Sequence, residues 1–300
     1  MIEIRQVSKR FGDITALNEM SAVIANGQIF GLVGTNGSGK STLLRLIAGV
    51  YKADSGTIGV DGESVYENPA VKAQLCLLPE AEAFQLNDTP ELACDKFCVY
   101  YPDFDRARYF DMLKSFDLDP KRKLRTFSKG MKKQVMLLLG IMSRTRYLLC
   151  DETFDGLDPV ARQAFKSLFA TEMLDRDFTP VIASHNMREL EDICDHVGLL
   201  HKGRILLSEN LEELKQNLQK VQCVLADKGR ETDLLREKTV VRSEQRGRLL
   251  SLVMTGTHDD VMRVVAQYEP VYAEGLPLTL EEIFINETEV AGYDIKNLFL

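Results

Sequence analysis

Residues 34–42 have the residue types and the spacing of a phosphate-binding loop. They read Gly34-Thr35-Asn36-Gly37-Ser38-Gly39-Lys40-Ser41-Thr42 and fit the pattern G-x-x-x-x-G-K-[S/T]. Glycines let the main-chain N–H groups of such a loop turn toward phosphate oxygens, and the positive end of the following helix faces them. We expect the whole segment to bind ATP, with Lys40 at the β- and γ-phosphates and the Ser41 hydroxyl on Mg²⁺. The alternative is a chance glycine-rich turn before a helix.

Two adjacent carboxylates follow an apolar run at residues 147–150. Asp151 stands where a buried strand ends, so it can hold Mg²⁺ through water as a Walker-B aspartate does. Glu152, one residue further, is placed to polarise an attacking water as a general base. The alternative is a solvated Asp-Glu pair at the start of a loop, but an idle carboxylate beside a buried strand is costly. The pair therefore predicts ATP hydrolysis.

The elements that must position these residues indicate an α/β nucleotide-binding domain. Residues 28–33 form an apolar run before the loop, and residues 41–50 have a helical pattern after it. Residues 180–183 form another apolar run that ends in polar residues, as buried strands of a largely parallel sheet do at a site. Residues 89–119 have a helical pattern, and residues 197–207 favour a closing hairpin.

The character of the sequence changes after residue 207. We place a domain boundary there, with a nucleotide-binding domain at residues 1–207 and a small α+β accessory domain at residues 208–300. The expected elements of the second domain are helices at 211–220 and 259–268 and strands at 221–225 and 249–254. Its role stays open.

Composition excludes several classes of function. The net charge of −8 argues against non-specific nucleic-acid binding. No apolar run approaches the roughly 20 residues that span a bilayer, and the N-terminus has no signal-peptide pattern, so we expect a cytosolic chain whose membrane role depends on a partner. The six cysteines include no C-x-x-C pair, which favours reduced structural thiols. One basic stretch is interpreted as a solvated or partner-facing surface: Lys121, Arg122, Lys123, Arg125, Lys129, Lys132 and Lys133.

With both motifs in place, residues 1–207 resemble the ABC ATPase family. Phe127-Ser128-Lys129-Gly130-Met131 stands where that family has its L-S-G-G-Q signature. The resemblance implies a P-loop ABC ATPase fold: a mixed-sheet core, an antiparallel β subdomain and a helical signature subdomain. It also implies that Ser128 and Gly130 contact the γ-phosphate held by another subunit. Simple N-capping by Ser128 is the alternative. Lys129 replaces a glycine and adds a cation to this contact.

Three further positions match the family. Asp155-Gly156-Leu157-Asp158 resembles the D-loop, which lies along the dimer interface. His185 matches the switch histidine at the γ-phosphate, whereas the other three histidines are interpreted as structural. Phe11 resembles the aromatic residue that stacks on adenine, with core packing as the alternative.

Glu80, in Leu77-Leu78-Pro79-Glu80, departs from the family. Most members have glutamine there, in the loop that senses Mg²⁺ and leads to the membrane partner. Glutamate keeps an acceptor oxygen for Mg²⁺ or its water but brings another negative charge near the triphosphate. We hypothesise that Glu80 joins Ser41 and Asp151 at the metal and raises the dependence of the protein on Mg²⁺.

The resemblance implies an ATP-hydrolysing subunit that drives a membrane transporter by ATP-dependent closure of a dimer, either homodimer or heterodimer. Residues 278–285 resemble a segment of bacterial exporter ATPases that pair with a separate ABC-2-type permease. The location implied is the inner face of the cell membrane. A non-transport ABC ATPase is the alternative, but such relatives carry two cassettes, a coiled-coil insertion or zinc cysteines. A P-loop kinase would not explain the signature or the switch histidine. The cargo is not encoded in this chain.

Overall fold

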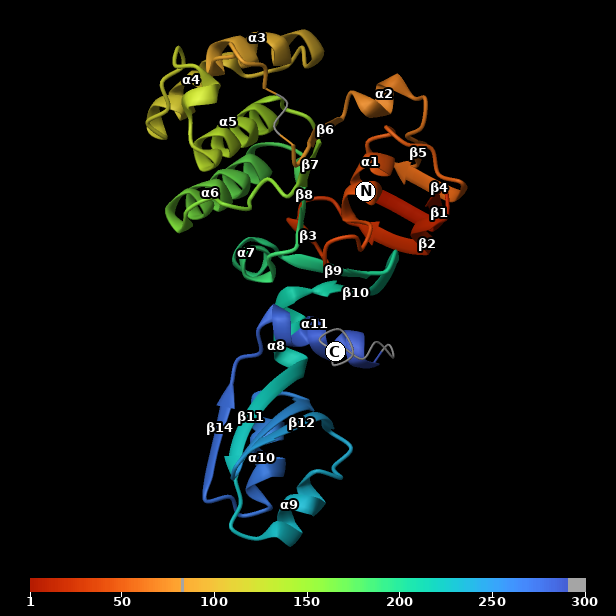
Figure 1. The fold of residues 1–300 in the computed structure, drawn as a ribbon, viewed down its shortest axis with the longest axis vertical. Coiled ribbons are helices and arrows are strands. Elements are labelled where there is room, and N and C mark those ends of the chain that lie inside the picture. The colour runs from red at the N-terminus through yellow and green to blue at the C-terminus, as the bar shows by residue number, and fades with distance from the viewer. Residues whose placement is uncertain (82–83, 291–300) are drawn as a thin grey trace. The chain divides into compact units, whose positions relative to one another are not determined.

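The computed structural model describes residues 1–81 and 84–290. The chain forms two compact units, one of residues 1–208 and one that begins at Glu209 (Figure 1). Every residue that the sequence predicts to bind ATP or Mg²⁺ lies in the first unit.

A six-stranded sheet forms the centre of the first unit. Its order is β10-β9-β3-β8-β7-β6. The strands are β3 (Phe30–Val33), β6 (Leu75–Leu78), β7 (Tyr147–Asp151), β8 (Thr179–Ser184), β9 (His196–His201) and β10 (Arg204–Asn210). β3 runs parallel to β8 and β9, and β7 runs parallel to β6 and β8. The carboxyl ends of β3, β7 and β8 therefore meet at one edge of the sheet, where ligands bind in such folds.

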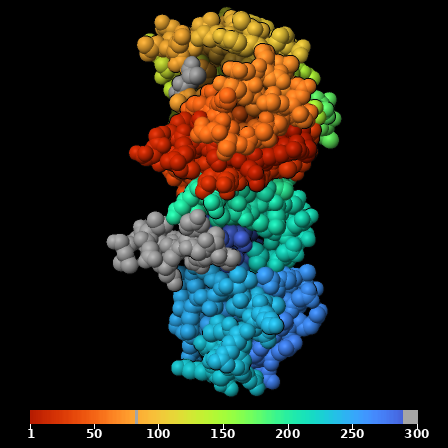
Figure 2. All heavy atoms as spheres, turned by 90° about the vertical axis from the view of Figure 1, so that its right-hand side faces the viewer, coloured from red at the N-terminus to blue at the C-terminus, as the bar shows by residue number. Residues whose placement is uncertain are grey.

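An antiparallel sheet in the order β2-β1-β4-β5 lies beside this centre (Figures 1 and 2, red to orange). Its strands are β1 (Ile2–Phe11), β2 (Ile14–Ile24), β4 (Ser55–Val60) and β5 (Glu63–Ser64). Side chains alternate along β1, so that Ile2 and Ile4 are buried and Arg5 is exposed. The buried face packs on helix α1 (Lys40–Ile47), which therefore lies between the two sheets. Packing on both sides fixes the helix that carries Lys40.

Helices cover the other side of the six-stranded sheet (Figure 1). The helices of this unit after α1 are α2 (Pro69–Lys72), α3 (Pro90–Tyr100), α4 (Arg106–Ser115), α5 (Lys129–Met142), α6 (Pro159–Asp175) and α7 (Met187–Ile193), with a 3₁₀ turn at Leu124–Thr126. Their starts follow capping chemistry: Thr89 caps α3 by accepting from Leu92 N, and Pro90 occupies the first helical turn. α5 packs against α3, α4 and β6, which joins the helical part to the sheet.

The second unit is a small α+β domain. Its elements are α8 (Leu211–Asn217), β11 (Leu218–Val224), α9 (Lys228–Leu234), β12 (Val240–Arg246), β13 (Leu249–Thr255), α10 (His258–Ala266), β14 (Tyr272–Leu276) and α11 (Leu280–Val290). From β11 to β14 the order is βαββαβ, and the sheet order is β12-β13-β11-β14 with antiparallel neighbours. One face of the sheet packs on α9 and α10 through Val221, Leu252 and Val265.

The helix predicted at residues 211–220 is wrong at its end. It stops at Asn217, and Leu218 to Lys220 begin β11. Lys220 pairs with Val253 on one side and with Leu276 on the other. The hydrogen bonds of a central strand therefore override the local helical pattern.

Candidate active site

The phosphate-binding loop joins β3 to α1. Lys40 begins α1, and its ammonium group donates to the main-chain oxygens of Gly34 (2.7 Å) and Thr35 (3.3 Å). A side chain at Gly34 would meet Leu200 O at 2.4 Å, and Gly39 has φ +111° with Ala16 O close by. Both positions therefore require glycine. The loop folds back over Lys40 and holds its ammonium group next to the N-terminus of α1.

Asp151 and Ser41 meet at the edge of the sheet. The Ser41 hydroxyl donates to Asp151 Oδ1 at 2.8 Å, and Arg45 Nη2 lies 3.7 Å from the other carboxylate oxygen. Asp151 is almost fully buried, and burial raises its pKa. Mg²⁺ fits this arrangement because a hydroxyl and a carboxylate are hard oxygen ligands and a cation would compensate the buried charge. Within the described residues no three His, Cys, Asp or Glu side chains form a metal cluster.

Glu152 is held by groups from two other motifs. One of its carboxylate oxygens lies 3.3 Å from Lys40 Nζ, and the other is hydrogen-bonded to His185 Nδ1 at 2.8 Å. The main-chain N–H of His185 also donates to this second oxygen, at 3.3 Å. The structure thus brings together the side chains of the loop, the carboxylate after β7 and the histidine after β8. A carboxylate between a cation and a histidine is equipped to orient and deprotonate a water.

The predicted signature segment lies at the start of α5 and caps that helix. Ser128 Oγ accepts from Met131 N at 3.1 Å, and the Ser128 side chain is exposed. Gly130 packs closely against the D-loop, because a side chain there would meet Gly156 O at 3.1 Å. Lys129 Nζ lies 3.5 Å from Asp155 Oδ2, so this added cation is paired within its own chain. No described contact joins Ser128 or Gly130 to Lys40 within the chain, so their contact with the nucleotide of another subunit stays a prediction.

Lys133 is a residue that the sequence interpretation placed wrongly. Its basic stretch was expected to be solvated, yet the Lys133 side chain is 3% exposed. Its ammonium group donates to the main-chain oxygen of Glu152 at 2.5 Å and lies 4.0 Å from Asp155 Oδ2. The signal was in the helical period: Lys133 precedes the buried positions Met136, Leu137 and Gly140 by three, four and seven residues. A side chain on the same helical face as core residues is predicted to be buried, even when it is a lysine.

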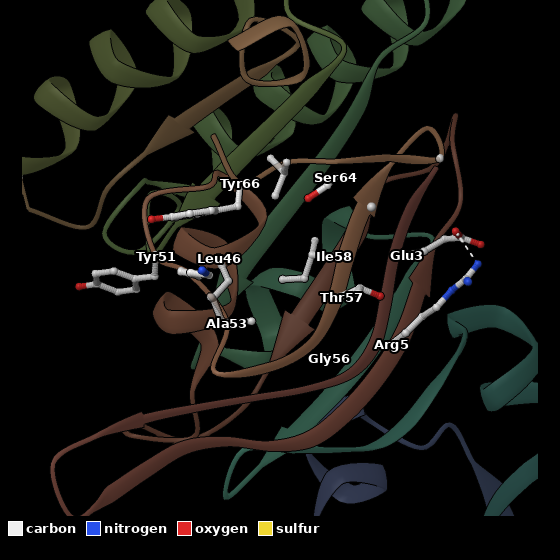
Figure 3. A pocket seen from close by; sticks show the side chains of 14 residues that line it. Glu3, Arg5, Leu46, Tyr51, Ala53, Gly56, Thr57, Ile58, Ser64 and Tyr66 are labelled. Carbon is white, nitrogen blue, oxygen red and sulfur yellow. Dashed lines mark hydrogen bonds and ion pairs between the residues drawn. The ribbon is translucent and has the colours of Figure 1, made fainter. Parts of the chain in front are cut away.

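Phe11 and Glu80 are predicted site residues outside this cluster, and both are exposed. Phe11 is 42% exposed, its ring packs edge-on against Tyr51 at 5.3 Å, and the Lys9 ammonium group lies over the ring at 5.4 Å. Glu80 is exposed. Burial is the largest cause of the raised pKa of Asp151, and the negative charges of Glu152 and then Glu80 raise it further. Tyr51 also lines a separate hollow of about 530 Å³ over β4 (Figure 3). No residue of the phosphate-binding loop lines that hollow.

Comparison with known proteins decides the family. The family model described as "ABC transporter" matches residues 17–155. The ABC transporter ATP-binding protein YtrB of Bacillus subtilis is 33% identical over 95% of this chain and 97% of its own length. This chain belongs to the ABC transporter ATP-binding proteins. The bacitracin transport ATP-binding protein BcrA of Bacillus licheniformis is 25% identical over 79% of each chain. The solved structure of an ATP-binding subunit of an ABC transporter matches with a TM-score of 0.65 and 25% identity, over 72% of this chain and 92% of that one.

The predicted family and the predicted ABC ATPase fold are therefore confirmed. As a member of the ABC transporter family, the chain is an ATP-binding subunit that hydrolyses ATP. No helix in residues 1–81 and 84–290 has the length and apolar character needed to cross a bilayer.

Proposed function

We propose that this chain powers an exporter by closing, as a dimer, around two ATP–Mg²⁺ and reopening after hydrolysis. The observation that carries the proposal is the cluster around Glu152, whose carboxylate lies 3.3 Å from the Lys40 ammonium group and 2.8 Å from His185 Nδ1. Relatives named for bacitracin and lantibiotic transport support a transport role. The partner proposed is a separate ABC-2-type permease, and the location is the inner face of the cell membrane.

The residues of one chain supply most of a hydrolytic site. Lys40 would exchange its contact with Glu152 for the β- and γ-phosphates, and main-chain N–H groups of residues 34–39 would surround the phosphates. Ser41 and Asp151, with Glu80 at the margin, would hold Mg²⁺, which neutralises phosphate charge. Phe11 would stack on adenine. Of these groups, Lys40, Ser41 and Asp151 lie at the edge of the sheet where the strands β3 and β7 end.

Glu152 would accept a proton from the attacking water. Once Lys40 has turned to the phosphates, Glu152 keeps its hydrogen bond to His185, which orients the carboxylate and lies beside the γ-phosphate. Ser128 and Gly130 of a second subunit would complete the site from outside. Because both sites need residues of both chains, ATP binds the closed dimer preferentially and shifts the population toward it.

The permease is proposed to dock near the loop after β6. Leu78, Phe84 and Phe97 line a small, largely apolar hollow of about 160 Å³ between this loop and the helical part. On α3, Val99 and Tyr100 are 77% and 78% exposed. Large exposed apolar side chains next to a hollow favour a protein interface. The same loop carries Glu80, so docking there would report the state of the nucleotide site to the permease.

The test is the substitution Glu152→Gln, which removes the base and keeps the shape of the side chain. We expect the rate of phosphate release to fall about 10²- to 10⁴-fold and the chain to elute as a dimer with ATP–Mg²⁺. Exposed Glu212→Gln is the matched control and should behave like the unchanged protein. A variant that stays monomeric at saturating ATP, or that retains full turnover, would refute the proposal.

A further inference from the structure

We propose that Lys133 is a positioning residue for ATP hydrolysis, which holds the main chain of Glu152 so that its carboxylate faces the nucleotide. The inference rests on the proposed role of Glu152 as the base. Lys133 itself touches neither nucleotide nor water in this scheme, because its ammonium group ends at the Glu152 carbonyl.

Burial of Lys133 is the first observation. The side chain is 3% exposed, and burial lowers its pKa while the Asp155 carboxylate opposes that shift. A buried ammonium group is unfavourable unless acceptors and counter-charges surround it. Here it has the Glu152 carbonyl at 2.5 Å and Asp155 at 4.0 Å, and its charge also favours ionisation of buried Glu189. An apolar side chain would fill the same space without this penalty, so the cation has another purpose.

The backbone of Glu152 is the second observation. Its φ is +52°, in the left-handed region that a residue with a side chain rarely adopts. Such a conformation persists only where neighbours hold it. The Glu152 N–H donates to Ala183 O at 2.9 Å, and its carbonyl accepts from Lys133. Both peptide groups that flank its Cα are thereby fixed, and with them the direction of Cβ.

The carboxylate depends on that direction. It reaches Lys40 with one oxygen and His185 with the other, at 3.3 and 2.8 Å. Without the Lys133 contact the Glu152–Thr153 peptide group is free to turn about ψ, and the backbone around the Glu152 Cα, strained at φ +52°, would relax and move both oxygens. Misplacement of a reacting group by about 1 Å can lower a rate about 100-fold. The carbonyl contact of Lys133 therefore bears on the rate of the chemical step more than on ATP binding.

The position of Lys133 on α5 adds a link between subunits. The same helix begins at Ser128 and carries Lys129, which pairs with Asp155, and Gly130, which packs on Gly156. α5 is thus fastened to residues 152–156 at three places. In the proposed dimer, the N-terminus of α5 contacts the nucleotide bound by the other subunit. The Lys133 contact would therefore couple nucleotide binding by the other subunit to the position of Glu152 in its own chain.

The test is a double-mutant cycle in the full chain. Lys133→Met removes the donor and keeps the length of the side chain, and it is made alone and together with Glu152→Gln. We expect Lys133→Met to lower kcat about 10- to 100-fold, which is the rate factor that corresponds to the free energy of one hydrogen bond to a charged group. KM for ATP should change less than twofold. In the Glu152→Gln background the same change should lower the residual single-turnover rate less than about twofold, because the carboxylate that it positions is gone. Lys114→Met, on an exposed turn of α4, is the matched control.

A merely structural role predicts something else. The proposal is overturned if Lys133→Met keeps its kcat within twofold of the unchanged protein, or if it loses the same factor in both backgrounds. If Lys133→Met does not fold, Lys133→Leu, which also lacks a donor, enters the same cycle and is judged by the same outcomes. Full turnover in Glu152→Gln alone would refute the proposed base. An inactive Glu152→Gln with a normal Lys133→Met would refute only the role of Lys133.

Discussion

The two units of the chain bury different kinds of side chain. In the described residues, the buried charged side chains all lie in the first unit: Lys40, Asp88, Lys133, Asp151, Glu152, Glu172 and Glu189. In the described part of the second unit, the buried side chains are apolar except for Asn286 and Thr288. Buried ions give little stability and often reduce it. The first unit therefore gives up stability to hold charges, and four of them, Lys40, Lys133, Asp151 and Glu152, lie in or beside the proposed ATP site. The described part of the second unit buries no charged side chain.

This contrast makes a general prediction. A substitution of a buried charge in the first unit should lower activity more than it lowers stability. A substitution of a core residue in the second unit should lower the stability of that unit and leave ATP hydrolysis unchanged. Lys40→Met and Leu252→Ala test the contrast directly, and changes at the exposed residues Phe11 and Glu80 set the scale for side chains of the first unit that are not buried.

The largest effect is expected from Lys40→Met. The substitution removes the cation that faces the phosphates and leaves Glu152 with His185 as its remaining side-chain partner in the cluster. Loss of one preorganised donor to developing charge lowers kcat about 10²- to 10³-fold. Phosphate release and ATP binding are measured beside Lys52→Met, an exposed lysine on the same unit. Normal ATP binding together with normal turnover would contradict the assigned site.

Leu252→Ala should act on the second unit only. Leu252 is fully buried between β11, β12 and the helices of that unit. A leucine-to-alanine change in a core costs about 2–5 kcal/mol. Hydrogen exchange followed by mass spectrometry should show loss of protection at residues 218–276 and unchanged protection at the phosphate-binding loop. Val253→Ala, on the opposite face of β13, is the control with a smaller effect. Equal loss of protection in both units would show that they unfold together and remove the contrast.

The residues of the site were largely predictable because their chemistry is local. The glycines of the loop, the carboxylates after β7 and the histidine after β8 each follow an apolar strand, and parallel strands bring such ends to one edge. Lys133 was not predicted. A run of lysines indicates a solvated surface. Only the helical period of α5, combined with its packing, shows that one of these lysines faces the core.

The second unit was predicted less well for a different reason. No chemical motif marks the ends of its strands, and their pairing joins residues far apart in sequence, such as Val221 with Gly275. Local propensity carries no information about such pairs, so the helix at α8 was extended into β11. The strand β12 is largely exposed and has no apolar period that would mark it. A site whose residues lie in short sequence motifs is thus easier to predict than a small domain whose fold depends on strand pairing between distant residues.

Phe11→Ala should have an intermediate effect on ATP binding. The Phe11 ring is 42% exposed and contacts Tyr51 edge-on and the Lys9 ammonium group, which adenine would join or displace. Stacking of an aromatic ring on a base contributes about 1–3 kcal/mol, so KM for ATP should rise about 5- to 100-fold with kcat nearly unchanged. Ile14→Ala changes the exposed partner of Phe11 in the β1–β2 hairpin and serves as the control. An unchanged KM would favour a packing role for Phe11.

The smallest effect is expected from Glu80→Gln. Glu80 is exposed, so solvent screens its charge, and exposed charge pairs contribute about 0–1 kcal/mol. Removing that charge should reduce repulsion of the triphosphate and weaken the hold on Mg²⁺, which lowers the dependence of ATP affinity on Mg²⁺ about two- to fivefold. The measurement is ATP affinity with Mg²⁺ and with excess chelator, beside exposed Glu209→Gln. Identical Mg²⁺ dependence in both variants would place Glu80 outside the metal site, so that Ser41 and Asp151 alone would carry the protein's share of the coordination.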